Sequence, residues 1–222
     1  MKEIDLISSL HKKTKRDYLA RVNNLKFPKH KAASLAKKFD YDYWDGDRQI
    51  CYGGYRYIEG RWNSVIRAMI KNYDLPSNPK ILDVGCGKGF LIYDFLKICP
   101  DAELYGLDIS DYAITNSPKE ISDKLIVGNA NNIPWPDDFF DLVISINTLH
   151  NLYNYDLYLA LKELQRVGKN KYICVESYRN ELEKANLLYW QVTCEAFNTP
   201  DEWKWCFSQA GYNGDYSFIY FE

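Results

Sequence analysis

Four residues near the middle of the chain could hold a ligand at the end of a strand. Asp83 closes a short apolar run, and Gly85, Gly87 and Gly89 then occupy alternate positions before an apolar stretch begins at Phe90. Glycines let a backbone approach a ligand closely, and the N-terminus of a following helix offers free N–H groups. A dinucleotide-binding loop, G-x-G-x-x-G, would place its third glycine at position 90. The spacing therefore indicates a nucleotide-like ligand held by a loop of another class.

A second acidic residue supports the same site. Asp108 lies 19 residues beyond Gly89, at the end of the run YGLD. A carboxylate at a strand end can accept both hydroxyls of a ribose in a bidentate fork. The glycine loop and Asp108 together predict a site for a ligand that contains a nucleoside.

The elements that must position these residues form an α/β pattern. After Pro79, short apolar runs alternate with helical stretches, which is typical of a parallel sheet wound by right-handed crossovers. The predicted strands are Lys80–Val84, Glu103–Leu107, Leu125–Val127, Asp141–Ile146, Tyr172–Glu176 and Tyr216–Phe221. The predicted helices between them are Phe90–Ile98, Asp111–Asn116, Tyr155–Val167, Glu181–Phe197 and Pro200–Ala210.

The residues before this core predict a helical appendage. Ile4–Val22 and His30–Phe39 are rich in helix-forming residues without interior glycine or proline, and Arg61–Tyr73 reads the same way. Asp40–Gly60 mixes aromatic residues with Gly and Asp, which favours an ordered loop over a linker. We therefore divide the chain into a helical appendage with an aromatic lid at 1–60 and an α/β domain at 61–222.

The motifs resemble those of class I S-adenosylmethionine-dependent methyltransferases. ILDVGCGKGF looks like the family's first motif, and PWPDDFFDLVISINTLHNL resembles the fourth. Between them, VGNANNIPW carries Asn129 between Gly128 and Ala130, where the family has Asp. The resemblance implies a Rossmann-like fold with a six- or seven-stranded, mostly parallel sheet flanked by helices. The family's antiparallel hairpin at the sheet edge is in doubt, because only GYNGDYSFIYFE remains for it.

The resemblance also implies the cofactor, S-adenosyl-L-methionine, and its contacts. The residues that match the cofactor-binding positions are Asp83, Gly85, Cys86, Gly87, Gly89, Asp108, Ile109, Asn129, Ala130 and Asn147.

Catalysis by such an enzyme chiefly requires alignment, because a sulfonium methyl group needs no activation. A base matters only for a hydroxyl or a protonated amine as acceptor. His150, with an ordinary pKa near 6.5, is then the predicted general base, and Asn147 is the predicted catalytic neighbour. Tyr55, Tyr57, Glu176 and Tyr178 are alternatives. A purely structural histidine stays an open interpretation.

Two segments outside the core could cover the acceptor, Asp40–Arg61 and Ser177–Pro200. The residues proposed for substrate or lid are Tyr43, Tyr55, Arg56, Tyr57, Arg61 and Tyr178, with Tyr41 and Trp44 beside them. An arginine there could take the cofactor carboxylate or an anionic acceptor. Packing of the N-terminal helices would explain the same aromatic residues without a ligand.

Several features bear on the acceptor. The place after the fourth strand reads SINTLHNL, without the [DNS]-P-P-[YFW] motif of exocyclic-amine nucleic-acid methyltransferases, so nucleic acid is disfavoured and a small molecule favoured. YGGYRYIEGRW and GDYSFIYFE are similar to segments of bacterial polysaccharide-cluster methyltransferases, which implies a sugar-derived acceptor of O- or N-methylation.

Two other functions stay open. The first 40 residues hold 11 Lys and Arg against 4 Asp and Glu, a basic arm that would suit an RNA or protein methyltransferase. A catalytically silent cofactor-binding protein would keep the same fold. Either a solvated helix face or a partner would explain the arm.

Composition places the chain among globular proteins, with 46% hydrophobic and 26% charged residues. We find no membrane span or signal peptide and expect a cytoplasmic protein. The six cysteines include no C-x-x-C pair, so neither a disulfide framework nor a metal site is expected. The sequence leaves the oligomeric state open.

Overall fold

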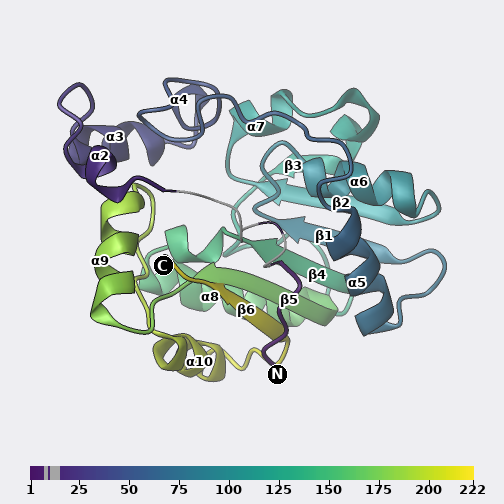
Figure 1. Cartoon of the computed structure of the whole chain (residues 1–222). Helices are drawn as coiled ribbons and strands as arrows, with labels where there is room; N and C mark the ends of the chain where they lie inside the picture. The colour runs from purple at the N-terminus through teal and green to yellow at the C-terminus, as the bar shows by residue number, and fades with distance from the viewer. Residues whose placement is uncertain (8–9, 11–15) are drawn as a thin grey trace.

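The computed structural model describes residues 1–7, 10 and 16–222 and is built around one parallel sheet (Figure 1). The strands are β1 (Lys80–Val84), β2 (Glu103–Asp108), β3 (Leu125–Val127), β4 (Phe140–Ile146), β5 (Gly168–Glu176) and β6 (Asp215–Ile219). They lie in the order β3-β2-β1-β4-β5-β6. This confirms the Rossmann-like α/β fold and settles the number of strands in the described sheet at six.

Helices cover both faces of the sheet because side chains alternate along the strands. On one face, Leu82 and Val143 pack against α8 (Asn154–Val167) and α10 (Pro200–Gln209). On the other, Ile81 packs in a second cluster. That cluster includes residues of α5 (Asn63–Tyr73), α6 (Phe90–Ile98) and α9 (Glu181–Trp190). The strands are thus buried on both sides, as parallel strands normally are.

The β6 edge differs from the expected hairpin. β6 pairs with β5 in parallel register, from Tyr172 opposite Asp215 to Glu176 opposite Ile219, and every strand pair among the described residues is parallel. The N-terminus lies along the outer side of β6, where Ile4 N–H donates to the Tyr216 carbonyl at 2.8 Å.

The helix predicted from Ile4 to Val22 is therefore wrong at its start. Ile4 lies along the β6 edge, and only Tyr18–Val22 (α2) is assigned as a helix beyond the undescribed residues 8–9 and 11–15. An open sheet edge offers backbone partners over a long sequence distance, which local helix propensity cannot reveal. Leu10 is helical as predicted, residues 16–17 are not, and the prediction for residues 8–9 and 11–15 lies outside the described residues.

Several predicted boundaries shift. β5 begins at Gly168, four residues before the predicted start, and β6 ends at Ile219 rather than Phe221. The remaining short elements are α7 (Asp111–Thr115) and the 3-10 turns η1 (Lys119–Lys124) and η2 (Leu149–Asn151). α9 ends at Trp190 and not at Phe197, and the N–H groups of Glu195 and Ala196 donate instead to the carbonyl of His150 at 2.9 and 3.0 Å.

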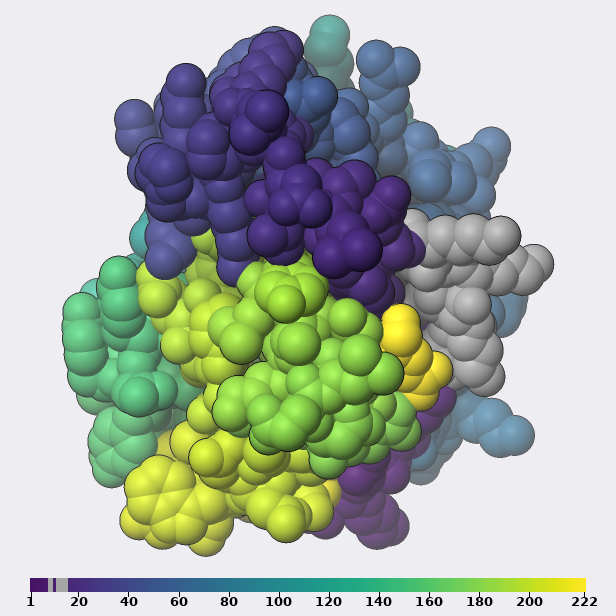
Figure 2. Space-filling model, turned by 60° about the vertical axis from the view of Figure 1, so that its left-hand side comes forward, coloured from purple at the N-terminus to yellow at the C-terminus, as the bar shows by residue number. Residues whose placement is uncertain are grey.

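The appendage packs closely on the core. It contains α2, α3 (Lys29–Ala36) and α4 (Tyr41–Trp44), and Figure 2 shows the purple N-terminal residues directly against the lime-green α9. Lys37 pairs with Glu195 of the core, and Trp44 Nε1 donates to the Ser110 hydroxyl at 2.9 Å. Within the appendage, Arg21 Nη2 donates to the carbonyl of Ile50 at 2.6 Å. These contacts join the basic segment to the chain itself. The domain boundary at residue 60 remains a prediction.

Within the part of the chain that the structure describes, none of the helices has the length and apolar character that a membrane crossing requires.

Candidate active site

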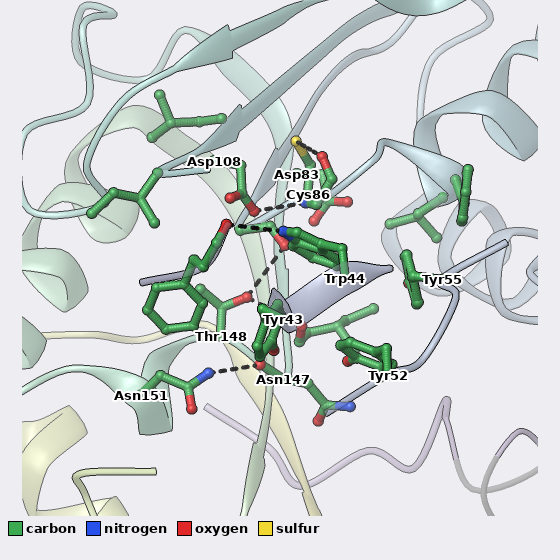
Figure 3. Close-up of a pocket in the computed structure, with 18 of the residues that line it drawn as sticks. Tyr43, Trp44, Tyr52, Tyr55, Asp83, Cys86, Asp108, Asn147, Thr148 and Asn151 are labelled. Atoms are coloured by element: carbon green, nitrogen blue, oxygen red, sulfur yellow. Dashed lines mark hydrogen bonds between the residues drawn. The ribbon is translucent and has the colours of Figure 1, made fainter. Parts of the chain in front are cut away.

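The candidate site lies where the strand order reverses, between β1 and β4, at the carboxyl ends of the strands. In open α/β sheets, ligands bind at this switch point. A pocket of about 410 Å³ opens there (Figure 3). Its lining includes the predicted residues Tyr43, Tyr55, Arg56, Arg61, Asp83, Gly85, Cys86, Gly87, Asp108, Ile109, Asn129, Ala130 and Asn147.

Two glycines of the loop after β1 are required by their surroundings. Gly85 has a φ of 80°, and a Cβ there would come within 2.0 Å of the Thr148 hydroxyl oxygen. Gly87 has a φ of 56°, and its Cβ would meet the ring of Trp44 at 2.7 Å. Both positions combine a left-handed backbone with no room for a side chain. The alternate glycines therefore bring the loop against the residue after β4 and against the appendage.

Asp108 joins two loops at the end of β2. One carboxylate oxygen accepts the Gly87 N–H at 2.7 Å, and the other accepts the Ser110 N–H at 2.8 Å. The side chain is buried, and burial raises the pKa of its carboxyl group while the two backbone N–H groups lower it. Each oxygen keeps a lone pair that a ligand hydroxyl could use.

Asp83 lies beside Asp108 in the same pocket. It is 5% exposed, and no hydrogen bond or ion pair joins its carboxyl group to a described residue. Burial, and then the neighbouring Asp108, raise the pKa of Asp83 to about 8. Two buried carboxyl groups facing one cavity favour a cationic ligand, because a positive charge would relieve their repulsion.

The ends of β3 and β4 complete the pocket. Asn129 and Ala130 follow β3, with Gly128 before them. After β4, Asn147 adopts a left-handed backbone with a φ of 57°, and its side-chain oxygen is buried without a hydrogen-bond partner among the described residues. Its carbonyl accepts from the Asn151 amide at 3.3 Å. An orphaned acceptor at a cavity wall is suited to a ligand that donates.

Four of the residues predicted for cofactor, catalysis or lid lie outside the pocket lining, as do Tyr41 and the alternative base Glu176. Gly89 is the N-cap of α6, and the Tyr57 hydroxyl donates to Asp94 on that helix. Tyr178 is buried in the hydrophobic cluster beside β5. The fourth, His150, lies in the turn η2 behind the pocket.

His150 is held in the interior by Glu176. Its Nδ1 accepts the Glu176 N–H at 3.4 Å, and its Nε2 lies 3.4 Å from the Glu176 carboxylate. Only 2% of His150 is exposed, and burial lowers its pKa to about 3, whereas burial raises the pKa of Glu176 to about 8. A neutral imidazole results. Its hydrogen bond to Glu176 holds η2, which contains the pocket residue Asn151 and follows Asn147, against the end of β5.

Aromatic rings from the appendage form one side of the pocket. Figure 3 shows Trp44 next to Asp83 and Asp108, with Tyr43 and Tyr52 continuing toward Asn147. The rings of Trp44 and Tyr52 stack with centroids 5.6 Å apart. The appendage is thus a wall of the site as well as packing for the core.

The two arginines at this wall are exposed and unpaired. Arg56 and Arg61 line the pocket, and neither side chain has an ion pair or a hydrogen bond to a described residue.

Sequence reasoning missed several lining residues. Thr148 and Asn151 follow β4 like Asn147, so their strand-end position could have revealed them. Tyr52 in the appendage and Trp62 at the start of α5 gave no positional signal, because only the folded chain brings them to the sheet.

Comparison with known proteins decides the family. A family model described as a methyltransferase domain matches residues 75–211. The chain belongs to this methyltransferase family. Residues 75–211 therefore form a methyltransferase domain with a Rossmann-like fold, and S-adenosyl-L-methionine is the cofactor of this domain.

Two curated relatives are named as methyltransferases. A demethylmenaquinone methyltransferase from Geobacillus sp. (strain WCH70) is 34% identical over 54% of this chain and 55% of its own length. A tRNA (carboxymethyluridine(34)-5-O)-methyltransferase from Arabidopsis thaliana is 36% identical over 51% of this chain and 28% of its own.

The structure of the YcgJ protein from Bacillus subtilis has a TM-score of 0.53 at 21% identity. It covers 65% of this chain and 66% of that one, and it supports the fold. The chain spans about half the length of the first curated relatives that it matches.

The pocket fits this cofactor. S-adenosylmethionine carries a sulfonium and an ammonium group, which suit the unpaired Asp83, and a ribose, which suits the free lone pairs of Asp108. The orphaned side-chain oxygen of Asn147 provides a further acceptor.

Proposed function

We propose that the enzyme methylates a small molecule that binds against the aromatic side of the pocket. The observation that carries this proposal is the shared cavity of about 410 Å³, walled by Tyr43, Trp44, Tyr52 and Tyr55. This volume lies toward the low end of the range for small-molecule sites, about 300–1,000 Å³. A cavity of this size, lined by rings, suits a small cyclic acceptor better than a polymer.

In this proposal the cofactor supplies an electrophilic methyl group, and the chain supplies binding, orientation and exclusion of water. Asp108 holds the ribose, Asp83 holds a cationic group, and Asn129 and Ala130 line the adenine side. Asn147 orients the reacting end, because its side chain follows β4 and faces the cavity.

The proposed acceptor is a sugar or a related metabolite, methylated on oxygen or nitrogen. Aromatic rings such as Tyr43 and Tyr52 can pack against the apolar face of a sugar ring, while Asn147 and Asn151 offer hydrogen bonds at the rim. The acceptor named for the Geobacillus relative, a menaquinone precursor, is a second cyclic molecule of the kind the wall would suit.

The base for such a reaction remains a proposal. His150 as the general base requires proton transfer to reach a neutral, buried imidazole that does not line the pocket. Among the alternative bases, Tyr55 lines the pocket, and burial raises its pKa to about 12. Neither group is poised near neutral pH, which favours an acceptor that needs little help in losing its proton.

A second candidate acceptor is RNA. The Arabidopsis relative is named for tRNA, and the side chains of Arg56 and Arg61 line the pocket without a partner among the described residues, where they could meet phosphate. Against this, Arg21 and Lys37 of the basic segment already bind the chain itself.

The test uses cofactor with a labelled methyl group. The protein is incubated separately with a small-metabolite extract and with total RNA from its source, and Asp108→Ala serves as the negative control. Label that enters only the small-metabolite fraction, in wild type alone, supports the proposal. Label in RNA, or in neither fraction, contradicts it.

A further inference from the structure

Trp44 is placed to touch the cofactor although it lies outside the matched residues 75–211. It is 7% exposed and lines the pocket. Its ring occupies the space that a Cβ of Gly87 would need, 2.7 Å from that position. Because Gly87 donates its N–H to Asp108, the indole lies against the same loop that holds the ribose acid.

The indole also connects the two loops that Asp108 joins. Trp44 Nε1 donates to the Ser110 hydroxyl at 2.9 Å and to the Phe39 carbonyl at 3.1 Å, and Ser110 in turn donates to Phe39. Trp44 therefore contacts the loop after β1 through its ring and the loop after β2 through its N–H. Few side chains could make both contacts, since the first needs a flat apolar surface and the second a donor.

An ion pair between the buried Lys88 side chain and the 25% exposed Asp45 side chain fixes the residue next to Trp44. Lys88, in the glycine loop, lies with its Nζ 2.6 Å from an Asp45 carboxylate oxygen, and its side chain is only 7% exposed. Asp45 also accepts from the Tyr112 hydroxyl at 2.9 Å and the Tyr55 N–H at 3.0 Å. A partly buried pair of this kind is a weak source of stability, because the desolvation of two charges offsets their attraction. Its geometry nevertheless holds the aromatic wall against the glycine loop.

We propose that Trp44 is a cofactor-binding residue that covers the ribose side of the S-adenosylmethionine site, and that the Asp45–Lys88 pair positions it. The proposal rests on the assignment of this pocket as the cofactor site. It makes the appendage part of the cofactor site, so that the methyltransferase domain alone lacks one wall of its pocket.

Calorimetric titration with S-adenosylhomocysteine tests the role of Trp44. Trp44→Ala should weaken binding by about tenfold or more, because a buried aromatic contact is lost. The matched control is Trp205→Ala, since Trp205 is 64% exposed on α10 and does not line this pocket. Equal affinities for Trp44→Ala and wild type would overturn the proposal.

A milder variant guards against misfolding. Trp44→Phe keeps a ring and removes the N–H donor, and thermal unfolding reports whether either variant folds. Binding of S-adenosylhomocysteine should change the tryptophan fluorescence of wild type and of Trp205→Phe, but change it much less in Trp44→Phe. A fluorescence response in Trp44→Phe equal to that of wild type would contradict direct contact.

The positioning role of the ion pair needs a double-mutant cycle. Lys88→Met should weaken binding of S-adenosylhomocysteine by about fivefold in wild type and by less than about twofold in Trp44→Ala, because the lysine acts through the indole. Lys204→Met, which removes an exposed pair with Asp201, is the control. Additive effects of the Lys88 and Trp44 substitutions would show that the pair does not position Trp44.

These measurements contain no methyl acceptor. If the Trp44→Ala and Lys88→Met variants bind S-adenosylhomocysteine with the affinity of wild type, only the inference about Trp44 fails. If no acceptor is methylated while S-adenosylhomocysteine binding responds as expected, only the proposed acceptor class fails. Loss of S-adenosylhomocysteine binding in wild type would remove the basis of both.

Discussion

The strand ends of the core and the aromatic wall of the appendage face each other across one pocket, yet they are built differently. At the strand ends, Asp83, Asp108 and Asn147 are placed by parallel strands whose register is fixed along the whole sheet. On the wall, Trp44 and Tyr52 are placed by one four-residue helix and the loop that follows it, held by hydrogen bonds and an ion pair to the core.

This difference separates what the fold supplies from what the individual chain adds. Parallel strands bring their carboxyl ends to one edge of the sheet, so the strand-end side of the pocket, where the cofactor is expected, follows from the fold. The wall depends on particular contacts between distant residues. We therefore expect cofactor binding to fail most completely when the strand-end side is changed, and the whole chain to lose stability when the wall is changed.

The largest effect should come from Asp108. Asp108→Ala removes the carboxylate that joins Gly87 and Ser110, so we expect affinity for S-adenosylhomocysteine to fall by about 100-fold or more. Titration calorimetry measures this loss, with the exposed Asp101→Ala as the control. If a folded Asp108→Ala protein keeps the wild-type affinity, the strand ends do not contribute more to S-adenosylhomocysteine binding than the aromatic wall does.

The next effect concerns the wall as part of the folding unit. Ile50 is 2% exposed and packs with Tyr43 and Trp44. Ile50→Ala should lower the free energy of unfolding by about 2–4 kcal/mol, with one cooperative transition for the whole chain. Denaturant unfolding measures this, and Leu25→Ala, at a residue that is 93% exposed, should change little. Two separate transitions would show that the appendage folds independently.

A smaller effect should appear in the pH dependence of cofactor binding. The pKa of Asp83 is raised to about 8, so the free protein holds a proton there that a cationic ligand displaces. Affinity for S-adenosylhomocysteine should rise by about tenfold between pH 6.5 and 8.5. Asp83→Asn should bind more weakly with a flatter profile. A wild-type profile that falls over this range would exclude this electrostatic role.

The same shift affects stability with the opposite sign. In the unfolded chain Asp83 loses its proton near pH 4, whereas the folded chain keeps it up to about pH 8. The contribution of this group to stability is therefore present at low pH and is lost as the pH rises through about 8. Asp83→Asn should lessen this loss in denaturant unfolding.

The smallest effect is expected for His150. Its imidazole is neutral above about pH 3 and lies behind the pocket, so His150→Gln should slow methyl transfer only a few-fold and leave the pH profile of kcat unchanged. Steady-state rates from pH 5.5 to 9 measure this. An acidic limb of the kcat profile that is present in wild type and disappears in His150→Gln would instead restore the general-base hypothesis.

The parts of this molecule that could be predicted are those with local or periodic causes. The strands around the glycine loop were predictable because their side chains are apolar without interruption, as burial on both faces requires. The tight loop at Gly85 and Gly87 was predictable from the glycines themselves, because glycine readily adopts the left-handed backbone that both residues have. Asp83 and Asp108 then follow from their positions at strand ends.

The parts that escaped prediction depend on contacts between distant residues. Nothing in SINTLHNL indicates that His150 faces Glu176 and the interior, since that direction depends on β5. The helix predicted through Phe197 ends at Trp190, and the N–H groups of Glu195 and Ala196 bond to His150 instead of continuing it. Trp44 looked like one aromatic residue among several, and only the fold places it on Gly87.

The pairing of the N-terminal residues with β6 has a practical consequence for testing the basic arm. Deleting residues 1–39 would leave the outer edge of β6 open, where Ile4 and Lys2 now exchange backbone hydrogen bonds with Tyr216. An exposed strand edge offers unpaired backbone groups that other chains can pair with. A truncated protein would therefore tend to aggregate, and its retention in an RNA-binding assay would not report on charge. Replacing lysines one by one, with the edge intact, is the cleaner way to ask whether the arm touches nucleic acid.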